Sequence, residues 1–556
     1  MKAGRESSAY RVLLAATFAA LLFAVGYQTR RPGTLELIIL DGAGGQPTPA
    51  RVELLDRDGT ARVADDALPV GGDCLDRPEA LRMPLERAVG LLSKNVRNPF
   101  TNTTQFYSAG NSIVTSLPSG TYRLKIHKGP EFNIAEREVQ IGPGERIRVV
   151  VELSRWINLA QQGWYSADDH LHIARPVDGL NPFLSKWMQA EDVHVANLLQ
   201  WGNSRVFHNT LQYAFGQPSL YREGDYLLAT GQENPRTHFR GHTIILGSQS
   251  PINFPSSYLI YTNYFQEAKR QGALSGYAHL GTWLGAPFGL AIDLPSGLVN
   301  FLEILQQDKE EWAAWYDILN TGFRLVPTAG TDYPCMGSFP GHDRFYTKVE
   351  GPLTYETWLE GVRQGRSFVT NGPMLDFSVA GKQMGEDVEL ERPGTITVQG
   401  RVRFDPKRDG VQRLELVANG QVIGSFPRLN DAGEISLRVP YQVRESSWLA
   451  LRARGWKQGE GSSWSPSPTS LAHSAPVYVT LKSATPLAAS PLAKTMARVW
   501  VTRLDDLEAR LAEGQLRYLA RPDASDGVDE SVLRRDRSGL IEGIRSARKA
   551  FVNRAR

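Results

Sequence analysis

The sequence has very little cysteine. Cys74 and Cys335 are the only two in 556 residues, and they fall in different predicted domains. A small disulfide-dense scaffold is thereby excluded, because such domains use several disulfides in place of a large core. Hydrophobic residues make up 41% of the chain, which is enough for ordinary folded cores. We expect both cysteines to be free thiols.

An excess of one charge is also missing. Lys and Arg number 62, Asp and Glu number 59, and the two signs are interleaved along the chain. A nucleic-acid-binding surface usually shows as a basic stripe with aromatic residues among the charges, and the sequence contains none. We therefore expect no nucleic-acid partner. A small molecule, or a fragment derived from a polymer, remains as the expected substrate.

Long apolar runs are limited to the N-terminus. Residues 1–31 carry basic side chains ahead of an uncharged, mostly apolar run at 12–26. That run is shorter than the roughly 17–25 residues that a membrane-spanning helix needs. The segment therefore predicts a signal peptide, with an uncleaved anchor as the alternative. In either case the protein is expected to be exported, as a periplasmic, extracellular or membrane-anchored protein. Membrane contact is expected only through this segment, if it is uncleaved.

A chain of this length is expected to form several domains. Residues 33–155 read as β structure, because 34–40 and 50–54 alternate in polarity and 146–153 is rich in β-branched residues. We predict a β-sandwich there. The polar, less patterned stretch at 62–110 is interpreted as an insertion.

Residues 158–375 show a different pattern, in which short apolar runs alternate with helical stretches. Three apolar runs end in polar residues, at Glu233, His279 and Asp332. Helices are expected at 308–319 and 354–363. This alternation is typical of a β/α barrel, in which functional groups gather at the C-terminal ends of the strands.

The remainder of the chain returns to β structure and then ends in helices. Strands are expected at 396–404, 414–417, 447–453 and 477–481, and Asn419-Gly420 is a strong hairpin signal. A second β-sandwich is therefore predicted at 376–485. The charged tail at 486–556 is expected to be helical, with a second helix at 541–552. The predicted fold class is multidomain α/β plus all-β.

Histidine is concentrated in one part of the chain. Eight of the ten histidines fall between positions 170 and 342. His170 and His172 follow a strand-like segment, and alternate residues of a strand point to the same side, so both imidazoles can face one cation. Imidazole suits zinc, iron and nickel. Asp168 lies in register to orient the two rings. A lone His-x-His motif is weak, and a solvated pair at a strand edge is the alternative.

Later residues strengthen the metal hypothesis. They are Glu233, His242, His279 and Asp332. A carboxylate at Glu233 could bridge two metals, although each residue alone could instead be a helix cap or a core histidine. His238 competes with His242, which we prefer as the ligand. His194 and His208 are expected to be structural.

The order His-x-His, Glu, His, His, Asp resembles the polymerase-and-histidinol-phosphatase (PHP) superfamily of metallohydrolases. The stretches at 163–172, 276–281, 330–334 and 365–373 are most similar to its CehA/McbA-type branch, named after carbaryl hydrolase, and 472–479 also fits. The resemblance covers about residues 160–480 and implies a distorted β/α barrel. It assigns one metal to His170, His172, Glu233 and Asp332, and a second to Glu233, His242 and His279. The first β-domain is similar to carboxypeptidase regulatory-like domains.

The sequence departs from the superfamily at two positions. Asn203 and Pro334 stand where many members have histidines that serve a third metal. An amide is a poor ligand for a transition metal and a proline side chain offers none, so we expect two divalent metals, Zn, Mn or Fe. His342 is the nearby residue that could fold back to restore the third site. Candidates for second-sphere or substrate contacts are Asp168, Asn203, Tyr333, Arg366 and His342.

These residues predict an exported metal-dependent hydrolase. A bound cation lowers the pKa of its water to roughly 7, which supplies hydroxide at neutral pH. Asp332 and Glu233 are the expected catalytic residues, and Asp332 could accept the proton of that water. The bond could be a phosphoester, or a carbamate, amide or ester. The alternative is a non-catalytic metal-containing barrel that binds carbohydrate or cell-wall material. An amidohydrolase barrel ranks lower, because Glu233 takes the place of the carboxylated lysine often found there.

Overall fold

The fold was examined in a computed structural model. It describes residues 31–71, 84–90, 92–98, 101–207, 209–279, 286–307, 309–310, 312–336, 338–430, 432–457, 469–511, 515, 519–520 and 526–556. The predicted targeting segment, except Arg31, lies outside the described residues, as do Cys74 and His208. Within the described ranges, no helix combines the length and apolar content needed to cross a bilayer.

The N-terminal part is built from two facing sheets. One sheet contains β2 (Gln46–Pro47), β1 (Gly33–Asp41) and β6 (Ile113–Leu117), with β9 (Arg146–Leu153) parallel to β1. The other contains β4 (Val96–Arg97), β5 (Thr104–Ser108), β3 (Ala50–Asp56), β7 (Gly120–His127) and β8 (Ala135–Ile141). Every second residue of β1 is buried, and Leu35 and Leu37 share a core with Val52 and Leu54 of β3. The β character predicted for 33–155 is confirmed.

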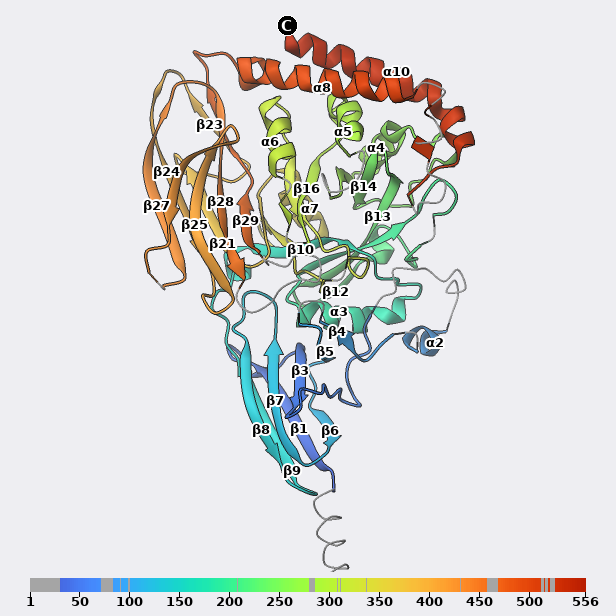
Figure 1. The fold of residues 1–556 in the computed structure, drawn as a ribbon, viewed down its shortest axis with the longest axis vertical. Helices are drawn as coiled ribbons and strands as arrows, with labels where there is room; N and C mark the ends of the chain where they lie inside the picture. Colours follow the sequence, from blue (N-terminus) through green and yellow to red (C-terminus); the bar gives the residue numbers. More distant parts are fainter. Residues whose placement is uncertain are drawn as a thin grey trace, which may run out of the picture.

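The predicted insertion joins this β-domain to the central one. Its short helix α2 (Leu85–Val89) and strand β5 lie beside α3 (Asn181–Ala190) of the next domain (Figure 1). Val70 and Tyr107 pack with Leu184 and Trp187 of α3 in one buried cluster. The insertion therefore supplies apolar surface for an interface, a role that its polar composition did not indicate.

The central part is a large mixed sheet with helices around it. Its strands are β10 (Trp164–Leu171), β11 (Val195–Trp201), β12 (Tyr221–Glu223), β13 (Tyr226–Thr237), β14 (Gly241–Leu246), β15 (Leu274–Tyr277), β16 (Phe301–Gln306), β17 (Lys309–Glu310), β18 (Val326–Ala329), β19 (Arg344–Lys348) and β20 (Ser367–Thr370). The helices are α3, α4 (Tyr261–Arg270), α5 (Ala286–Asp293), α6 (Trp312–Asn320) and α7 (Tyr355–Arg363). The predicted helices at 308–319 and 354–363 correspond to α6 and α7.

Strand direction follows the predicted β/α alternation only in part. The pairs β10–β11, β11–β13, β15–β16 and β16–β18 are parallel, as β/α units require. In contrast, β13, β14 and β15 pair antiparallel, and no α-helix separates β11 from β14. Glu233, expected after a strand, lies within β13, which continues to Thr237 past a register shift. The parallel partner β11 does end opposite Glu233, at Trp201.

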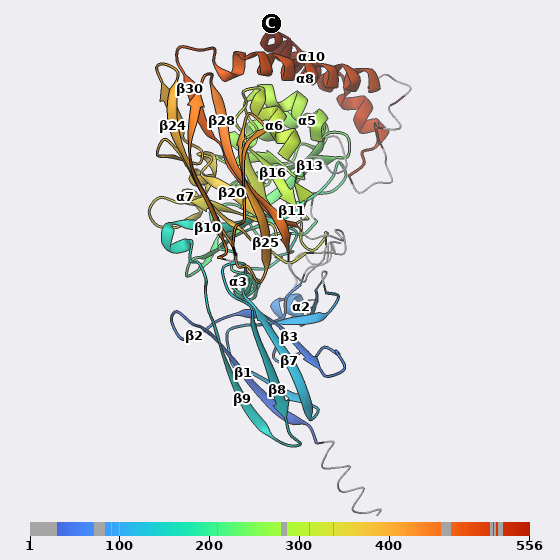
Figure 2. The ribbon, with the colours of Figure 1, turned by 60° about the vertical axis from the view of Figure 1, so that its left-hand side comes forward.

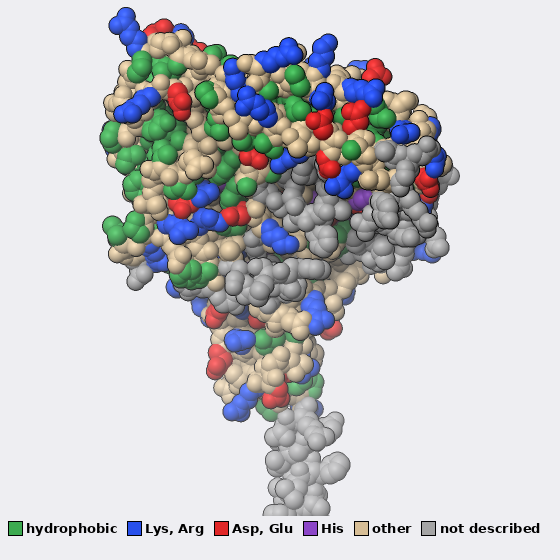
Figure 3. Space-filling model, turned by 45° about the horizontal axis from the view of Figure 1, so that its top comes forward, with side chains coloured by type: hydrophobic (Ala, Val, Ile, Leu, Met, Phe, Trp, Pro, Cys, Tyr) green, Lys and Arg blue, Asp and Glu red, His purple; other side chains and the backbone are tan. Residues whose placement is uncertain are grey.

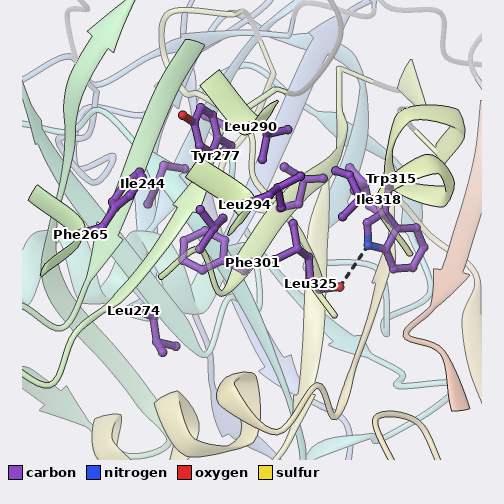
Figure 4. Packing of buried hydrophobic residues seen from close by; sticks show 14 of the residues in the cluster. Ile244, Phe265, Leu274, Tyr277, Leu290, Leu294, Phe301, Trp315, Ile318 and Leu325 are labelled. Carbon is purple, nitrogen blue, oxygen red and sulfur yellow. Dashed lines mark hydrogen bonds between the residues drawn. The ribbon is translucent and has the colours of Figure 1, made fainter. Parts of the chain in front are cut away.

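Apolar packing holds the central sheet against its helices. Phe265 of α4, Leu290 of α5 and Ile318 of α6 meet strand residues such as Ile244 and Phe301 in one buried cluster (Figure 4). Within it the indole nitrogen of Trp315 donates a 3.1 Å hydrogen bond to the carbonyl of Leu325. This core fixes the strand ends that carry the candidate site.

The second β-domain shares a sheet with the central domain. One of its sheets contains β22 (Lys382–Gln383), β21 (Met374–Val379), β24 (Gly394–Arg403) and β27 (Glu434–Val443). The other contains β23 (Asp387–Leu390), β25 (Asp409–Ala418), β26 (Gln421–Pro427), β28 (Ser447–Lys457), β29 (Thr469–Ser474) and β30 (Val477–Leu481). Since β29 pairs antiparallel with β20, this second sheet continues the central one. The predicted hairpin at Asn419-Gly420 joins β25 to β26.

The C-terminal tail forms two long helices that lie across the central domain. They are α8 (Pro491–Arg510) and α10 (Glu530–Ala555), which run side by side over α5 and α6 (Figures 1 and 2). Leu504, Leu507 and Leu511 recur on the buried face, as the sequence predicted, and join the cluster of the central sheet. On the face seen in Figure 3, Lys and Arg side chains are interspersed with Asp and Glu.

Candidate metal centre

The first part of the site forms at the end of β10. This strand pairs with β11 on one side and with β19 on the other, and its register shifts between Asp168 and Leu171. The shift lies at the point where His170 leaves the ladder. The Nε2 atoms of His170 and His172 lie 3.2 Å apart, and both rings are buried. The prediction that the two imidazoles face one point therefore agrees with the geometry.

Asp332 completes this first group from the loop after β18. Its Oδ1 lies 3.2 Å from Nε2 of His172 and 3.5 Å from Nε2 of His170. The loop is held against β10, because the amide of His172 donates a 2.7 Å hydrogen bond to the carbonyl of Tyr333. Asp332 has a positive φ of 53°, which a non-glycine residue rarely adopts. The packed loop thus turns this carboxylate toward the histidines.

A second group lies beside the first. It consists of Glu233 from β13, His242 from β14 and His279 from the end of β15. Oε1 of Glu233 is 2.7 Å from Nδ1 of His242 and 3.8 Å from Nε2 of His279. Glu233 and His242 lie close together because β13 and β14 pair antiparallel. His279 follows β15, which pairs with the other edge of β14.

Glu233 faces both groups. While its Oε1 faces His242 and His279, its Oε2 lies 3.2 Å from Nε2 of His172 and 3.9 Å from Nε2 of His170. The side chain is almost fully buried, with 2% exposed. One carboxylate therefore stands between two sets of imidazoles, with one oxygen turned to each.

The donor sets fit metal ions. In each group the ligand atoms all lie within 4.8 Å of one another. Atoms bonded to one ion at about 2.0–2.2 Å lie roughly 3–4 Å apart, so the observed separations need little adjustment. Mixed imidazole and carboxylate donors suit zinc, manganese or iron. All six predicted ligands are thus brought together in two sets of three.

The charges in the centre favour ionised carboxylates. Burial alone would raise the pKa of Glu233, but the Arg236 charge and the neighbouring His242 and His172 hold it well below its usual value. Burial likewise opposes charge on His172, yet hydrogen bonds to Asp332 and Glu233 raise its pKa to about 9. Ionised carboxylates are the form that binds a cation.

Asp168 does not orient the imidazoles as predicted. Its carboxylate accepts hydrogen bonds from the amides of His170, Thr331 and Gly341 at 3.0, 3.1 and 2.8 Å, and from the Thr331 hydroxyl at 2.6 Å. The sequence placed Asp168 correctly beside the histidines. Two of its partners, Thr331 and Gly341, are 163 and 173 residues away and were not visible in the local pattern. Asp168 therefore fixes the loop that carries Asp332.

Sequence reasoning missed a second layer of carboxylates. Glu303 of β16 is fully buried, and its two oxygens each lie 3.3 Å from Nδ1 of His170. Its Oε2 also accepts a 2.7 Å hydrogen bond from the amide of His279. Burial raises the pKa of Glu303 well above its usual value, and the same holds for the neighbouring Asp169. The available signal was an acidic residue inside an apolar strand, which needs a partner when buried.

Arg236 was also missed. It lies on β13 with its Nε 3.7 Å from Oε1 of Glu233, and its guanidinium stacks 4.5 Å over the ring of Trp201. Trp201 in turn meets the ring of His172 at 6.2 Å. The Arg236 side chain lies beside the centre and is largely buried, with 12% exposed. The sequence pattern gave no reason to prefer it over other arginines.

Three of the remaining predicted contact residues serve the fold. The Asn203 side chain accepts hydrogen bonds from the amides of Arg205 and Val206 at 2.9 and 3.1 Å, and so shapes its own loop. The ring of Tyr333 packs edge-on against Trp187 at 5.3 Å. Arg366 pairs with Glu350 at 2.6 Å rather than with a residue of the centre.

The other histidines that the structure describes lie outside the two groups. His342 lines a cavity of about 710 Å³ at the junction of the three domains, and is not part of either ligand set. His194 bonds to the Ser166 hydroxyl at 2.8 Å and stacks on Tyr226, as expected for a structural residue. His238 lies close in sequence to His242, but the geometry places His242 in the second group, in line with our preference. His208 is outside the described residues.

The expectation of free thiols is wrong. Cys335 is disulfide-bonded, and it follows Asp332 by three residues. The chain has one other cysteine, Cys74, which lies outside the described residues. Two cysteines so far apart in sequence gave no spacing from which a bond could be inferred. The bond constrains the loop that presents Asp332.

Comparison with family models and with curated proteins gives no match. The donor geometry and the chemistry of the residues around it are therefore the basis for inferring the function of this chain.

Proposed function

We propose that this chain is an exported metal-dependent hydrolase with a two-metal centre at one end of a distorted barrel of the PHP type. The observation that carries the proposal is the placement of Glu233, whose two oxygens face separate sets of imidazoles. A carboxylate in that position can bridge two cations. A non-catalytic binding domain has no need of such an arrangement, so hydrolysis is favoured over carbohydrate binding.

The centre has a buried side and a more exposed side. His170 is fully buried and Glu233 nearly so, whereas the side chains of Asp332 and His279 are 13% and 18% exposed. When bound, divalent cations at such a centre lower the pKa of a water to roughly 7 and supply hydroxide at neutral pH. Asp332 is the less deeply buried of the two carboxylates and would hold or accept the proton of that water. Substrate would approach from this side.

Arg236 favours an anionic substrate. It is the cation next to the bridging carboxylate, and its stacking on Trp201 fixes the plane of its guanidinium. A planar guanidinium donates paired hydrogen bonds to phosphate oxygens. A neutral carbamate or amide offers no such negative charge. We therefore place phosphoesters ahead of carbamates, amides and esters.

Metal removal tests the proposal directly. We expect a strong chelator to abolish hydrolysis of p-nitrophenyl phosphate or bis-p-nitrophenyl phosphate, and Mn²⁺, Zn²⁺ or Fe²⁺ to restore it. A panel of p-nitrophenyl carbamates, p-nitrophenyl carboxylate esters and p-nitroanilide amides would show the substrate class. Full activity in protein verified to be metal-free would overturn the proposal.

Stoichiometry tests the number of sites. With Asn203 engaged in its own loop, Pro334 lacking a ligand atom and His342 lining another cavity, we expect two metals per chain by elemental analysis. The variant His342→Ala should leave that count unchanged. Three tightly held metals, or loss of one in His342→Ala, would mean that a third site exists.

Export is proposed from the N-terminal segment, and the disulfide at Cys335 supports it. Disulfides persist in oxidising compartments outside the cytoplasm. Fractionation of the native host should place the protein outside the cytoplasmic membrane, free or anchored. A soluble cytoplasmic pool that retains Met1 would refute this part of the proposal.

A further inference from the structure

The C-terminal tail reaches the candidate metal centre. Asp526 lies between the two tail helices, and its side chain is only 10% exposed. Its Oδ2 lies 3.4 Å from Nε2 of His242, a residue 284 positions earlier in the chain. The tail therefore contacts one of the six candidate ligands.

His242 is held from both sides of its ring. Its Nδ1 lies 2.7 Å from Oε1 of Glu233, and its Nε2 is hydrogen-bonded to Oδ2 of Asp526 at 3.4 Å. Histidines that bind metals through one ring nitrogen commonly donate the N–H of the other to a carboxylate, which fixes the tautomer and the ring orientation. With Nδ1 turned to the centre, the proton belongs on Nε2, where Asp526 accepts it.

Other contacts hold the segment around Asp526 in place. The carbonyl of Asp526 accepts a 3.2 Å hydrogen bond from the amide of His238, which precedes β14. Asp529 pairs with Arg205 at 3.0 Å, at the end of the β11 loop. The carboxylate of Asp536 accepts a 2.9 Å hydrogen bond from the amide of Leu259 and is itself buried. These contacts come from three separate loops of the central domain.

Packing makes the placement rigid. Leu533, Leu540 and Ile544 of α10 are buried in the same apolar cluster as the central sheet. The helix that follows Asp526 is therefore part of the core and not a loosely attached extension. A carboxylate fixed to such an element stays at a defined distance from His242.

We propose that Asp526 is a positioning residue that orients His242 toward the second metal, and that the C-terminal tail is a structural part of the metal centre. The inference rests on the proposed function, because it assumes that Glu233, His242 and His279 bind a metal. It assigns a role to a tail whose composition alone indicated only charged helices.

The variant Asp526→Asn tests the role of the carboxylate. The amide is nearly isosteric but a weaker acceptor, so we expect the affinity for the second metal to fall about 10- to 100-fold. The first metal, held by His170, His172 and Asp332, should bind as in the wild type. Competition with a chromophoric chelator, over a range of Zn²⁺ or Mn²⁺ concentrations, resolves the two affinities without any use of activity.

Asp529→Asn is the matched control. It makes the same chemical change on the same segment and removes the anchor to Arg205, but Asp529 touches no candidate ligand. We expect it to keep both metal affinities within about twofold of the wild type. Asp526→Glu keeps a carboxylate and should recover part of the affinity. The metal-free forms of wild type and Asp526→Asn should unfold at similar temperatures, with a difference that appears only when metal is added.

The outcomes are separable. Wild-type affinity for both metals in Asp526→Asn overturns the inference, and so does an equal loss in Asp529→Asn, which would indicate a general structural effect. Loss of both metals together in Asp526→Asn also contradicts it. If the wild type binds two metals but hydrolyses no substrate, the proposed function fails, while the selective loss in Asp526→Asn would still support the positioning role.

Discussion

At the scale of single residues, Glu233 is the side chain that links the two groups of candidate ligands into one centre. Its oxygens are divided between the two groups, and neither group has another carboxylate placed to face the other. Each histidine contributes one nitrogen to one group. Loss of a histidine should therefore weaken one group, whereas loss of Glu233 should weaken both.

We expect Glu233→Gln to lower total metal content more than His279→Ala does. The amide removes the negative charge that both groups share, while His279→Ala leaves the first group intact. Hydrolysis should fall more than about 100-fold in Glu233→Gln, since ligand loss costs at least as much as loss of a ligand's outer partner. Elemental analysis of metal per chain measures the difference. Equal metal content in both variants and the wild type would remove Glu233 from the site.

Cys335 provides a second test at this scale. Because it is disulfide-bonded, protein recovered from an oxidising compartment should show no reactive thiol in denaturant, and two after reduction. The bond constrains the unfolded chain, so Cys335→Ser should lower the free energy of unfolding by about 2–4 kcal/mol. Thiol titration and denaturant unfolding give the two readings. Thiols that react without reduction in exported protein would contradict the assignment.

At the scale of elements, the sequence predicted several strands, the helices α6 and α7 and a helical tail, because polarity patterns and turn signals are local. The hairpin at Asn419-Gly420 and the helix α7 are examples, and the apolar runs ahead of His279 and Asp332 correctly marked strand ends. Pairing partners were not predictable in the same way. The antiparallel β13–β14 pair depends on contacts that a β/α pattern does not encode.

The same limit applies to the site. The six candidate ligands were found because histidines and acids at strand ends are visible in the sequence. Arg236 lies only three residues from Glu233, but the pattern did not distinguish it from other arginines. Glu303 and Asp526 were missed because they contact ligands that are 133 and 284 residues away in the sequence. Spatial partners of this kind follow from tertiary packing alone.

The contact between β29 and α6 gives a prediction on pH. His473 of β29 is fully buried, and its Nε2 lies 2.5 Å from the hydroxyl of Tyr316 in α6. Burial lowers the pKa of His473 to about 3, from an ordinary value near 6.5. The folded state therefore disfavours the charged form. The contribution of His473 to the free energy of unfolding is therefore complete above pH 6.5. It is lost as the pH falls toward the pKa of this histidine in the folded state.

We expect the variant His473→Gln to lack this loss of folding stability at low pH. Each pH unit between the two pKa values costs about 1.4 kcal/mol, so from pH 6.5 to 5 the wild type should lose about 2 kcal/mol more than the variant. Urea unfolding at several pH values measures both slopes. The buried His194, whose pKa is lowered to about 4, contributes equally to both proteins and cancels in the comparison. Parallel slopes would mean that His473 does not carry the acid sensitivity.

At the scale of the whole molecule, the parts predicted as separate domains are joined to different extents. The N-terminal sandwich has its own core and meets the central domain through polar contacts, such as Arg51 with Glu191 at 2.7 Å, and through the insertion. The second sandwich instead continues the central sheet through β20 and β29, and the tail helices share the central core. We expect the cooperativity of unfolding to follow these connections between the parts.

We therefore expect the central sheet and the second sandwich to unfold together, with the N-terminal sandwich as a separate unit. Leu451 in the second sandwich and Leu54 in the first are each at most 1% exposed. Truncation of either side chain to alanine should therefore lower the free energy of unfolding by roughly 2–5 kcal/mol. Leu451→Ala should accelerate amide hydrogen exchange in β16 of the central sheet, because the shared sheet transmits the loss. Leu54→Ala should accelerate exchange in β3 and β7 and leave β16 protected. If Leu451→Ala affects only strands of its own sandwich, the β20–β29 pairing does not couple the two parts, and the boundary predicted near residue 375 separates independent units after all.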